Sequence, residues 1–168
     1  MHLLRILAVL LVSLALLTSA TAQPQRTTGA SGLPLPRFAS LASGEVNVRA
    51  GPGLEFPIRW LYSRPGLPVR ILEEYDVWRL IEDPDGDQGW THSSLLSTQR
   101  TMMVQAPGVQ DVHRLANNDS RVVVRAEQGV IGELLNSDQA WCRVEISGRR
   151  GWLPRPTIWG VLDYEWRS

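Results

Sequence analysis

Few residues of this 168-residue chain are able to act as a nucleophile or a base. Cys142 is the single cysteine, and His92 and His113 are the histidines outside the first 22 residues. Strand alternation across Trp141–Ile146 places Cys142 on one face with two β-branched residues, the pattern of a small buried apolar side chain. A hydrolase also needs a base and an orienting group close to its nucleophile. We therefore expect no enzymatic activity.

The acidic run Glu82–Asp87 raises the possibility of a calcium site. An EF-hand loop requires glycine at its sixth position and glutamate at its twelfth. Counted from Asp83, those positions hold Gln88 and Ser94. A run of this composition is more typical of a solvated hairpin turn. Two isolated histidines do not make a metal centre, so we expect no metal and no cofactor.

Aromatic residues are frequent in the first half of the chain, next to a small acidic cluster. Strand alternation directs Trp78 and Ile81 to opposite faces of one strand, and it does the same for Trp141 and Val144. Both tryptophans therefore fall on the outer face if Ile81 and Val144 point inward. Aromatic side chains with one exposed edge are common at binding surfaces, although packing accounts for each one singly. We hypothesise a groove for an extended ligand with a cationic group, lined by Phe56, Trp60, Tyr75 and Trp90 and edged by Glu73, Glu74 and Asp76.

The amino terminus has the pattern of a cleavable secretory signal peptide over residues 1–22. Met1–Arg5 is a short basic start, Ile6–Leu17 is almost wholly apolar, and Ala20–Ala22 offers small residues for cleavage. The alternative, an uncleaved membrane anchor, is less favoured because the apolar run is short for a bilayer span. Residues 23–37 are rich in Pro, Gly, Ser and Thr, which predicts a flexible linker.

The chain after the predicted cleavage site has sixteen arginines and seventeen acidic residues. This balance lacks the basic excess that nucleic-acid binding requires, so we expect no nucleic-acid partner. With one cysteine no internal disulfide is possible, and the fold must depend on its hydrophobic core.

One unit occurs twice in the remaining sequence. Gly66 precedes Trp78 by 12 residues and Gly129 precedes Trp141 by the same 12, which gives an offset of 63. Each copy continues with a β-branched residue, a turn and a Gly-Trp pair, at Gly89-Trp90 and Gly151-Trp152. Short alternating segments separated by tight turns predict about five strands per copy and no helix. The expected fold is all-β, two tandem small antiparallel barrels.

These motifs resemble the bacterial SH3-like domain family, in its exported tandem form. The resemblance rests on VNVRAGPG at 46–53, RPGLPV at 64–69, VWRLI at 77–81 and GWTHSSLL at 89–96. The expected barrels span residues 38–104 and 108–163, joined by Gln105–Gly108. The second copy diverges: Val112-His113-Arg114 keeps the strand and the arginine, but Leu115–Asn118 replaces the Ala-Gly-Pro-Gly loop. A join this short predicts that the barrels pack on each other.

The resemblance implies a non-catalytic binding or adaptor protein, periplasmic or secreted. Its expected partner is a peptidoglycan stem peptide or an envelope protein, bound by the aromatic groove. A purely structural protein–protein module without affinity for peptidoglycan is the main alternative. A cell-wall hydrolase is a remote one, because few residues remain for a catalytic domain. Contact with the membrane is expected only through the transient signal peptide.

Overall fold

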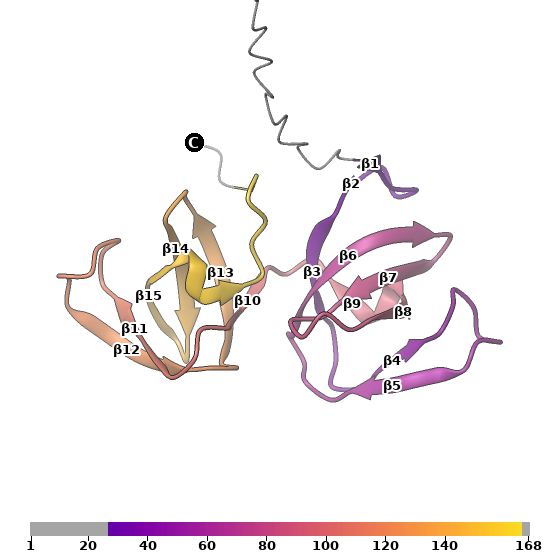
Figure 1. Ribbon diagram of the computed structural model, residues 1–168, viewed down its shortest axis with the longest axis horizontal. Helices are drawn as coiled ribbons and strands as arrows, with labels where there is room; N and C mark the ends of the chain where they lie inside the picture. Colours follow the sequence, from indigo (N-terminus) through magenta and orange to yellow (C-terminus); the bar gives the residue numbers. More distant parts are fainter. Residues whose placement is uncertain (1–26, 166–168) are drawn as a thin grey trace, which may run out of the picture.

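The computed structural model describes residues 27–165 of the chain (Figure 1). The predicted signal peptide, residues 1–22, and the start of the predicted linker lie outside the described residues. The described part contains two seven-stranded sheets, a two-stranded ribbon and two short 3-10 turns. No helix within residues 27–165 has the length and apolar character needed to cross a membrane. The predicted all-β class with two tandem barrels is confirmed.

The first barrel is an antiparallel sheet with the strand order β5-β4-β8-β7-β6-β3-β9. The 3-10 turn η1 (Ser93–Leu95) lies between β8 and β9 in the chain. The strands in chain order are β3 (Arg37–Leu41), β4 (Val46–Arg49), β5 (Ile58–Tyr62), β6 (Pro68–Tyr75), β7 (Trp78–Glu82), β8 (Gln88–His92) and β9 (Leu96–Ser97).

The second barrel repeats this topology strand for strand. Its order, β12-β11-β15-β14-β13-β10-β16, is the first order with each strand replaced by its counterpart, and η2 (Arg155–Thr157) corresponds to η1. The duplicated unit is thus present in the fold. Each copy has two strands beyond the five predicted, one at each end. The strands are β10 (Thr101–Val104), β11 (Val109–His113), β12 (Val122–Glu127), β13 (Ile131–Ser137), β14 (Trp141–Ile146), β15 (Arg149–Pro154) and β16 (Ile158–Trp159).

The boundary predicted between the barrels is wrong by several residues. β10 pairs with β13 and β16, so residues 101–104 belong to the second barrel. The chain crosses from one barrel to the other at residues 98–100. Residues 105–108 form a turn that joins β10 to β11, where the amides of Gln105 and Ala106 donate to the carbonyl of Thr157 and Gly108 has a φ of 76°. Their composition is as suitable for this turn as for a linker.

The strands follow the alternation of the sequence. In β4, Val46 and Val48 are fully buried and Asn47 is exposed. The turn predicted at Ser147-Gly148 joins β14 to β15 with φ values of 51° and 72°, as a two-residue hairpin of the I′ kind requires. The Asp83 carboxylate accepts the amides of Asp85 and Asp87, both at 2.9 Å, and so closes the predicted β7–β8 turn.

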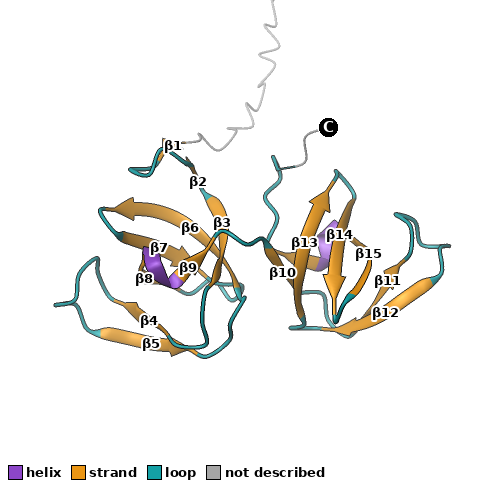
Figure 2. Ribbon diagram, turned by 180° about the vertical axis from the view of Figure 1, so that it is seen from behind, coloured by secondary structure: helices purple, strands orange, loops and turns teal. Residues whose placement is uncertain are grey.

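The two barrels pack against each other along a seam. The seam lies between β3 and β6 of the first barrel and β10, β13 and β16 of the second, whereas the loops that close the hairpins β4–β5 and β11–β12 lie at the outer ends (Figure 2). Met103 and Ile131 of the second barrel pack against the core of the first. Phe38 meets Trp159 edge to face at 5.2 Å, and the guanidinium of Arg70 lies 5.1 Å from the centre of the Trp159 ring. The predicted packing of the barrels is therefore present.

Polar contacts reinforce the seam from both sides. The Gln99 amide donates to the Glu133 carboxylate at 2.6 Å. Beyond β16 the chain turns back, so that Glu165 pairs with Arg100 at 2.6 Å. The neighbouring Tyr164 hydroxyl donates to the carbonyl of Pro36, just before β3. The last described residues thus contact the start of the first barrel.

The prediction of a flexible linker over residues 23–37 is wrong for residues 27–37. β1 (Thr27–Thr28) pairs with β2 (Pro34–Leu35), and the chain continues directly into β3. Leu35 belongs to the core of the first barrel. The hydroxyl and the amide of Ser31, in the turn between β1 and β2, donate to Glu74 of β6 at 2.8 and 2.6 Å. These contacts offset the entropy cost of ordering a segment of low hydrophobicity.

Glu74 is the residue that holds this ribbon. Its side chain has no exposed area, and its carboxylate pairs with Arg37 of β3 at 2.5 Å and with Arg79 of β7 at 3.3 Å. Burial by itself raises the pKa of Glu74, but the hydrogen bonds from Ser31 and the charge of Arg37 lower that pKa to about 2. The ionised carboxylate is therefore part of the folded structure at neutral pH.

We predict that Glu74→Gln destabilises the protein by about 3 kcal/mol at pH 7, because it leaves two arginines around an uncharged group. The stabilisation by Glu74 is fully present above pH 4.5, the ordinary pKa of the group, and is lost as the pH falls towards 2. Urea unfolding at a series of pH values measures both effects. Glu73→Gln, an exposed neighbour, is the matched control. An equal free energy of unfolding for the two variants would contradict the role of Glu74.

Candidate functional site

The thiol of Cys142 is buried, as predicted. The side chain lies in the core of the second barrel with Val144 and Ile146 and has no exposed area. Burial raises the pKa of the thiol to about 12, so the thiol is protonated at neutral pH. Both histidines within residues 27–165 have a partner other than Cys142: His92 Nδ1 lies 2.7 Å from the Ser94 hydroxyl, and His113 Nδ1 lies 2.9 Å from the Ser120 carbonyl.

We predict that a maleimide or disulfide reagent labels Cys142 only after the protein is unfolded. Reagents of this kind attack the thiolate, which is scarce here both because the pKa is high and because the sulfur is inaccessible. Labelling is followed by mass spectrometry at pH 7.5 with and without 6 M guanidinium. Stoichiometric labelling of the folded chain within minutes would overturn the assignment of Cys142 to the core.

The acidic run forms the hairpin turn that its composition predicts. Besides its two backbone donors, the Asp83 carboxylate accepts the Tyr62 hydroxyl at 2.6 Å and is 6 % exposed. Within residues 27–165, no three His, Cys, Asp or Glu side chains are grouped closely enough to hold a metal ion.

The predicted aromatic groove is divided between two faces of the sheet. Trp60 pairs with the buried Val48 and packs against the core on the inner side. Its ring lies beside Gly89, where an added Cβ would come within 3.3 Å of it. Trp90 follows Gly89 directly and points to the outer face, opposite Arg49. A ligand on one face therefore cannot contact both tryptophans.

The outer face brings together Tyr75, Trp78 and Trp90 on adjacent strands. Tyr75 pairs with Trp78, and Trp78 pairs with His92, two residues beyond Trp90. Trp78 and Ile81 point to opposite faces of the sheet, as alternation predicts. Trp78 is nevertheless only 8 % exposed, and its ring meets that of His92 edge to face at 5.6 Å. Trp141, which also lies on the outer face, makes the same kind of contact with His113 at 5.9 Å.

The other predicted groove residues lie in three different settings. The ring of Phe56 covers Gly51 in the β4–β5 loop, so closely that an added Cβ on Gly51 would come within 2.5 Å of it. Glu73 and Asp76 are exposed on β6 and in the turn after it. Glu74 is occupied by its arginines and Ser31. The structure therefore does not gather the seven residues into one groove.

The first loop is held differently in the two copies. Arg49 donates to the carbonyls of Leu54 and Phe56 at 3.1 and 2.8 Å. The motif Val112-His113-Arg114 predicts Arg114 as the counterpart of Arg49, and this is wrong. Gly89 approaches the carbonyl of Arg49, and Gly151 approaches that of His113 in the same way. His113, bonded to the Ser120 carbonyl, thus takes the place of the arginine.

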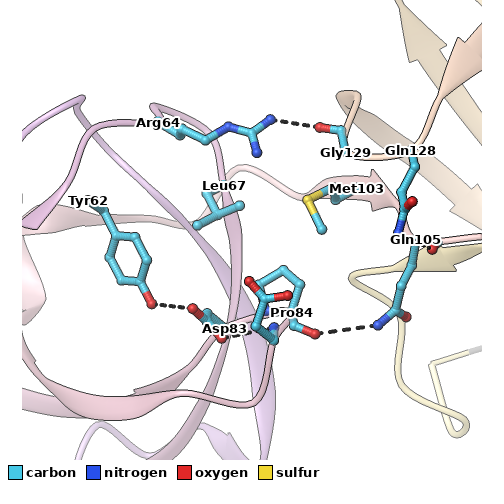
Figure 3. A pocket seen from close by; sticks show the side chains of 10 residues that line it. Tyr62, Arg64, Leu67, Asp83, Pro84, Met103, Gln105, Gln128 and Gly129 are labelled. Atoms are coloured by element: carbon cyan, nitrogen blue, oxygen red, sulfur yellow. Dashed lines mark hydrogen bonds between the residues drawn. The ribbon is translucent and has the colours of Figure 1, made fainter. Parts of the chain in front are cut away.

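A cleft of about 390 Å³ lies between the two barrels (Figure 3). The first barrel contributes the end of β5, the loop that follows it and the β7–β8 turn. The second contributes β10, the turn after it and the loop before β13. The lining residues are Tyr62, Arg64, Leu67, Asp83, Pro84, Asp85, Met103, Gln105, Gln128 and Gly129.

The cleft separates opposite charges across an apolar strip. Figure 3 shows Arg64 on one side and Asp83 on the other, with Leu67 and Met103 between them. Arg64 Nη2 donates to the carbonyl of Gly129 at 2.7 Å, which fixes the guanidinium across the seam. Burial, followed by the hydrogen bond to Asp83, raises the pKa of Tyr62, so the phenol stays protonated as the donor to that carboxylate.

Two glutamines of the second barrel close the cleft. Gln105 Nε2 reaches the carbonyl of Pro84 at 3.4 Å, across the seam. Gln128 Nε2 donates to the backbone carbonyl of Gln105 at 3.2 Å. This cleft was not predicted from the sequence, because its residues come from both copies. The equivalent loops before Gly66 and Gly129 meet at this cleft, and their repetition in the sequence was the one indication of it.

Comparison with known proteins identifies the family. The model of the bacterial SH3 domain matches residues 42–98 and again residues 110–160, more than half of the chain. The chain therefore belongs to the bacterial SH3 domain family and carries two copies of the domain. This confirms the resemblance seen in the sequence.

A curated relative and two solved structures are also similar. The relative is a Bacillus subtilis (strain 168) protein named "Putative N-acetylmuramoyl-L-alanine amidase YrvJ", 26 % identical over 125 residues. The match covers 68 % of this chain but only 24 % of the relative. The structures are NlpC1 and NlpC2 from Trichomonas vaginalis, 12 % and 10 % identical, with TM-scores of 0.36 and 0.34. They cover 82 % and 74 % of this chain and 47 % and 48 % of their own chains.

Proposed function

We propose that this protein is a periplasmic or secreted binding protein that recognises a peptide of the cell wall without covalent chemistry. The observation that carries the proposal is the cleft between two bacterial SH3 domains fixed against each other. Its combination of a fixed guanidinium, carboxylates and amides suits a polar peptide. The secretory pattern of residues 1–22 supports export.

The relative supports a role at peptidoglycan. By its name it concerns the bond between N-acetylmuramic acid and L-alanine, where a stem peptide joins the glycan. The present chain spans about a quarter of that protein, so its own activity is a separate question. Burial and protonation of Cys142 favour recognition over hydrolysis, because the thiol is inaccessible to a substrate.

We predict that the full chain sediments with purified peptidoglycan and releases no soluble muropeptides from it. The bound fraction should fall as salt is raised from 50 to 500 mM, because the cleft is lined by charges that salt screens. The pellet is analysed by gel electrophoresis and the supernatant by liquid chromatography. Absence of the protein from the pellet would refute the proposal, and released muropeptides would favour a hydrolase.

A protein partner of the cell envelope is the second candidate, and one observation favours it. β5 is the edge strand of the first barrel. Exposed apolar side chains gather on β5 and the loop before it, namely Leu54, Phe56, Ile58 and Leu61, with exposures of 76, 37, 48 and 54 %. An exposed apolar edge of this kind is suited to pairing with an extended segment of another protein.

The two candidates are separated by one substitution. Ile58→Glu places a charge on the apolar edge, at the end of β5 opposite to Tyr62, which lines the cleft. If the function is peptidoglycan binding by the cleft, the variant sediments like the wild-type chain. If the variant instead loses a specific envelope protein that cross-links to the wild-type chain, the second candidate is supported and the first is not.

A further inference from the structure

The cleft holds fixed charges of both signs, and this limits the ligands that can fill it. One N–H group of Arg64 is taken by the Gly129 carbonyl, whereas Nη1 and Nε donate no hydrogen bond to another described residue. Arg64 is exposed. An anchored guanidinium with free donors is a preferred partner for a carboxylate.

The opposite side of the cleft is acidic. Asp83 has both carboxylate oxygens occupied, one by the amides of Asp85 and Asp87 and the other by Tyr62. These hydrogen bonds fix the orientation of the Asp83 carboxylate, so its negative charge contributes to the electric field in the cleft. Asp85 is exposed and lines the same side, so its carboxylate is able to reach a ligand directly. This side favours an ammonium group.

A ligand with a single charge would pair with the charged side chain on one side of the cleft and leave the charge on the other side unpaired. A ligand that carries a carboxylate and an ammonium a few bonds apart would satisfy both. The apolar strip of Leu67 and Met103 is suited to the Cα that carries both charges and to the methylenes of the side chain that ends in it (Figure 3). The side-chain amides of Gln105 and Gln128 supply hydrogen bonds to a peptide backbone.

We infer that the cleft recognises a peptide side chain ending in a free amino-acid group, with its carboxylate at Arg64 and its ammonium at Asp85. This rests on the proposed function, and it names the part of the cell-wall peptide that is bound. The ligand class is a short peptide containing a diamino-dicarboxylic acid. Discrimination then comes from unpaired charge: a peptide that lacks either group leaves its partner in the cleft desolvated and unsatisfied.

The test uses three tetrapeptides with both ends blocked and different third residues. Diaminopimelate presents both groups, lysine presents the ammonium alone, and 2-aminopimelate presents the carboxylate alone. Calorimetric titration of the full chain should show the diaminopimelate peptide binding at least about tenfold more tightly than either of the others. Equal affinity for the three peptides would overturn the inference.

Two variants assign each charge to its side of the cleft. Arg64→Gln should abolish the preference for diaminopimelate over lysine and keep the preference over 2-aminopimelate. Asp85→Asn should do the reverse, as in a double-mutant cycle between protein and ligand. Arg64→Lys, which keeps the charge, should recover part of the lost preference. Unchanged preferences in both variants would show that the peptide binds elsewhere.

Controls separate binding from folding. Arg121→Gln removes an exposed arginine of the second barrel that does not line the cleft, and it should leave all three affinities unchanged. Thermal unfolding checks that Arg64→Gln, which loses the bond to Gly129, remains folded. If the chain sediments with peptidoglycan but does not distinguish the peptides, this inference fails and the proposed function stands. If it does not sediment, both fail.

Discussion

Burial of Met103 and Ile131 against the core of the first barrel is the contact on which the arrangement of the chain depends. A barrel of some 60 residues has a small core, without a disulfide here to add stability. Apolar area supplied by the second barrel enlarges that core and fixes the relative position of the two. Phe38 and Trp159 extend the same contact to β3 and β16. The cleft is a consequence, because its lining comes from both barrels and this contact sets their relative position.

Much of the fold is encoded in local patterns, and those parts are predictable. Alternation places Val46 and Val48 of the first copy, and Val112 of the second, in the core. Turn residues such as Ser147-Gly148 require φ values that few other sequences adopt. The first and last strands of each copy lack such signals. β3 and β10 are recognisable only from their partners β6 and β13, which lie about thirty residues later in the chain.

The candidate site was less predictable, because sequence shows a charge but not its surroundings. Glu73, Glu74 and Asp76 look equivalent in the sequence, yet only Glu74 meets Arg37, from a strand more than thirty residues earlier. Trp60 and Trp90 look like neighbours in a groove, yet the pleat of the sheet directs them to opposite faces. The cleft itself depends on how two copies pack, which no motif within one copy records.

The contact between Tyr164 and the Pro36 carbonyl gives the chain a closed outline. The chain therefore enters the first barrel and leaves the second barrel at neighbouring points on the surface. A pair of domains whose ends lie close together can be inserted into a longer polypeptide with little disturbance of the segments on either side. A domain joined after Glu165 would then lie beside the Pro36 end of the seam.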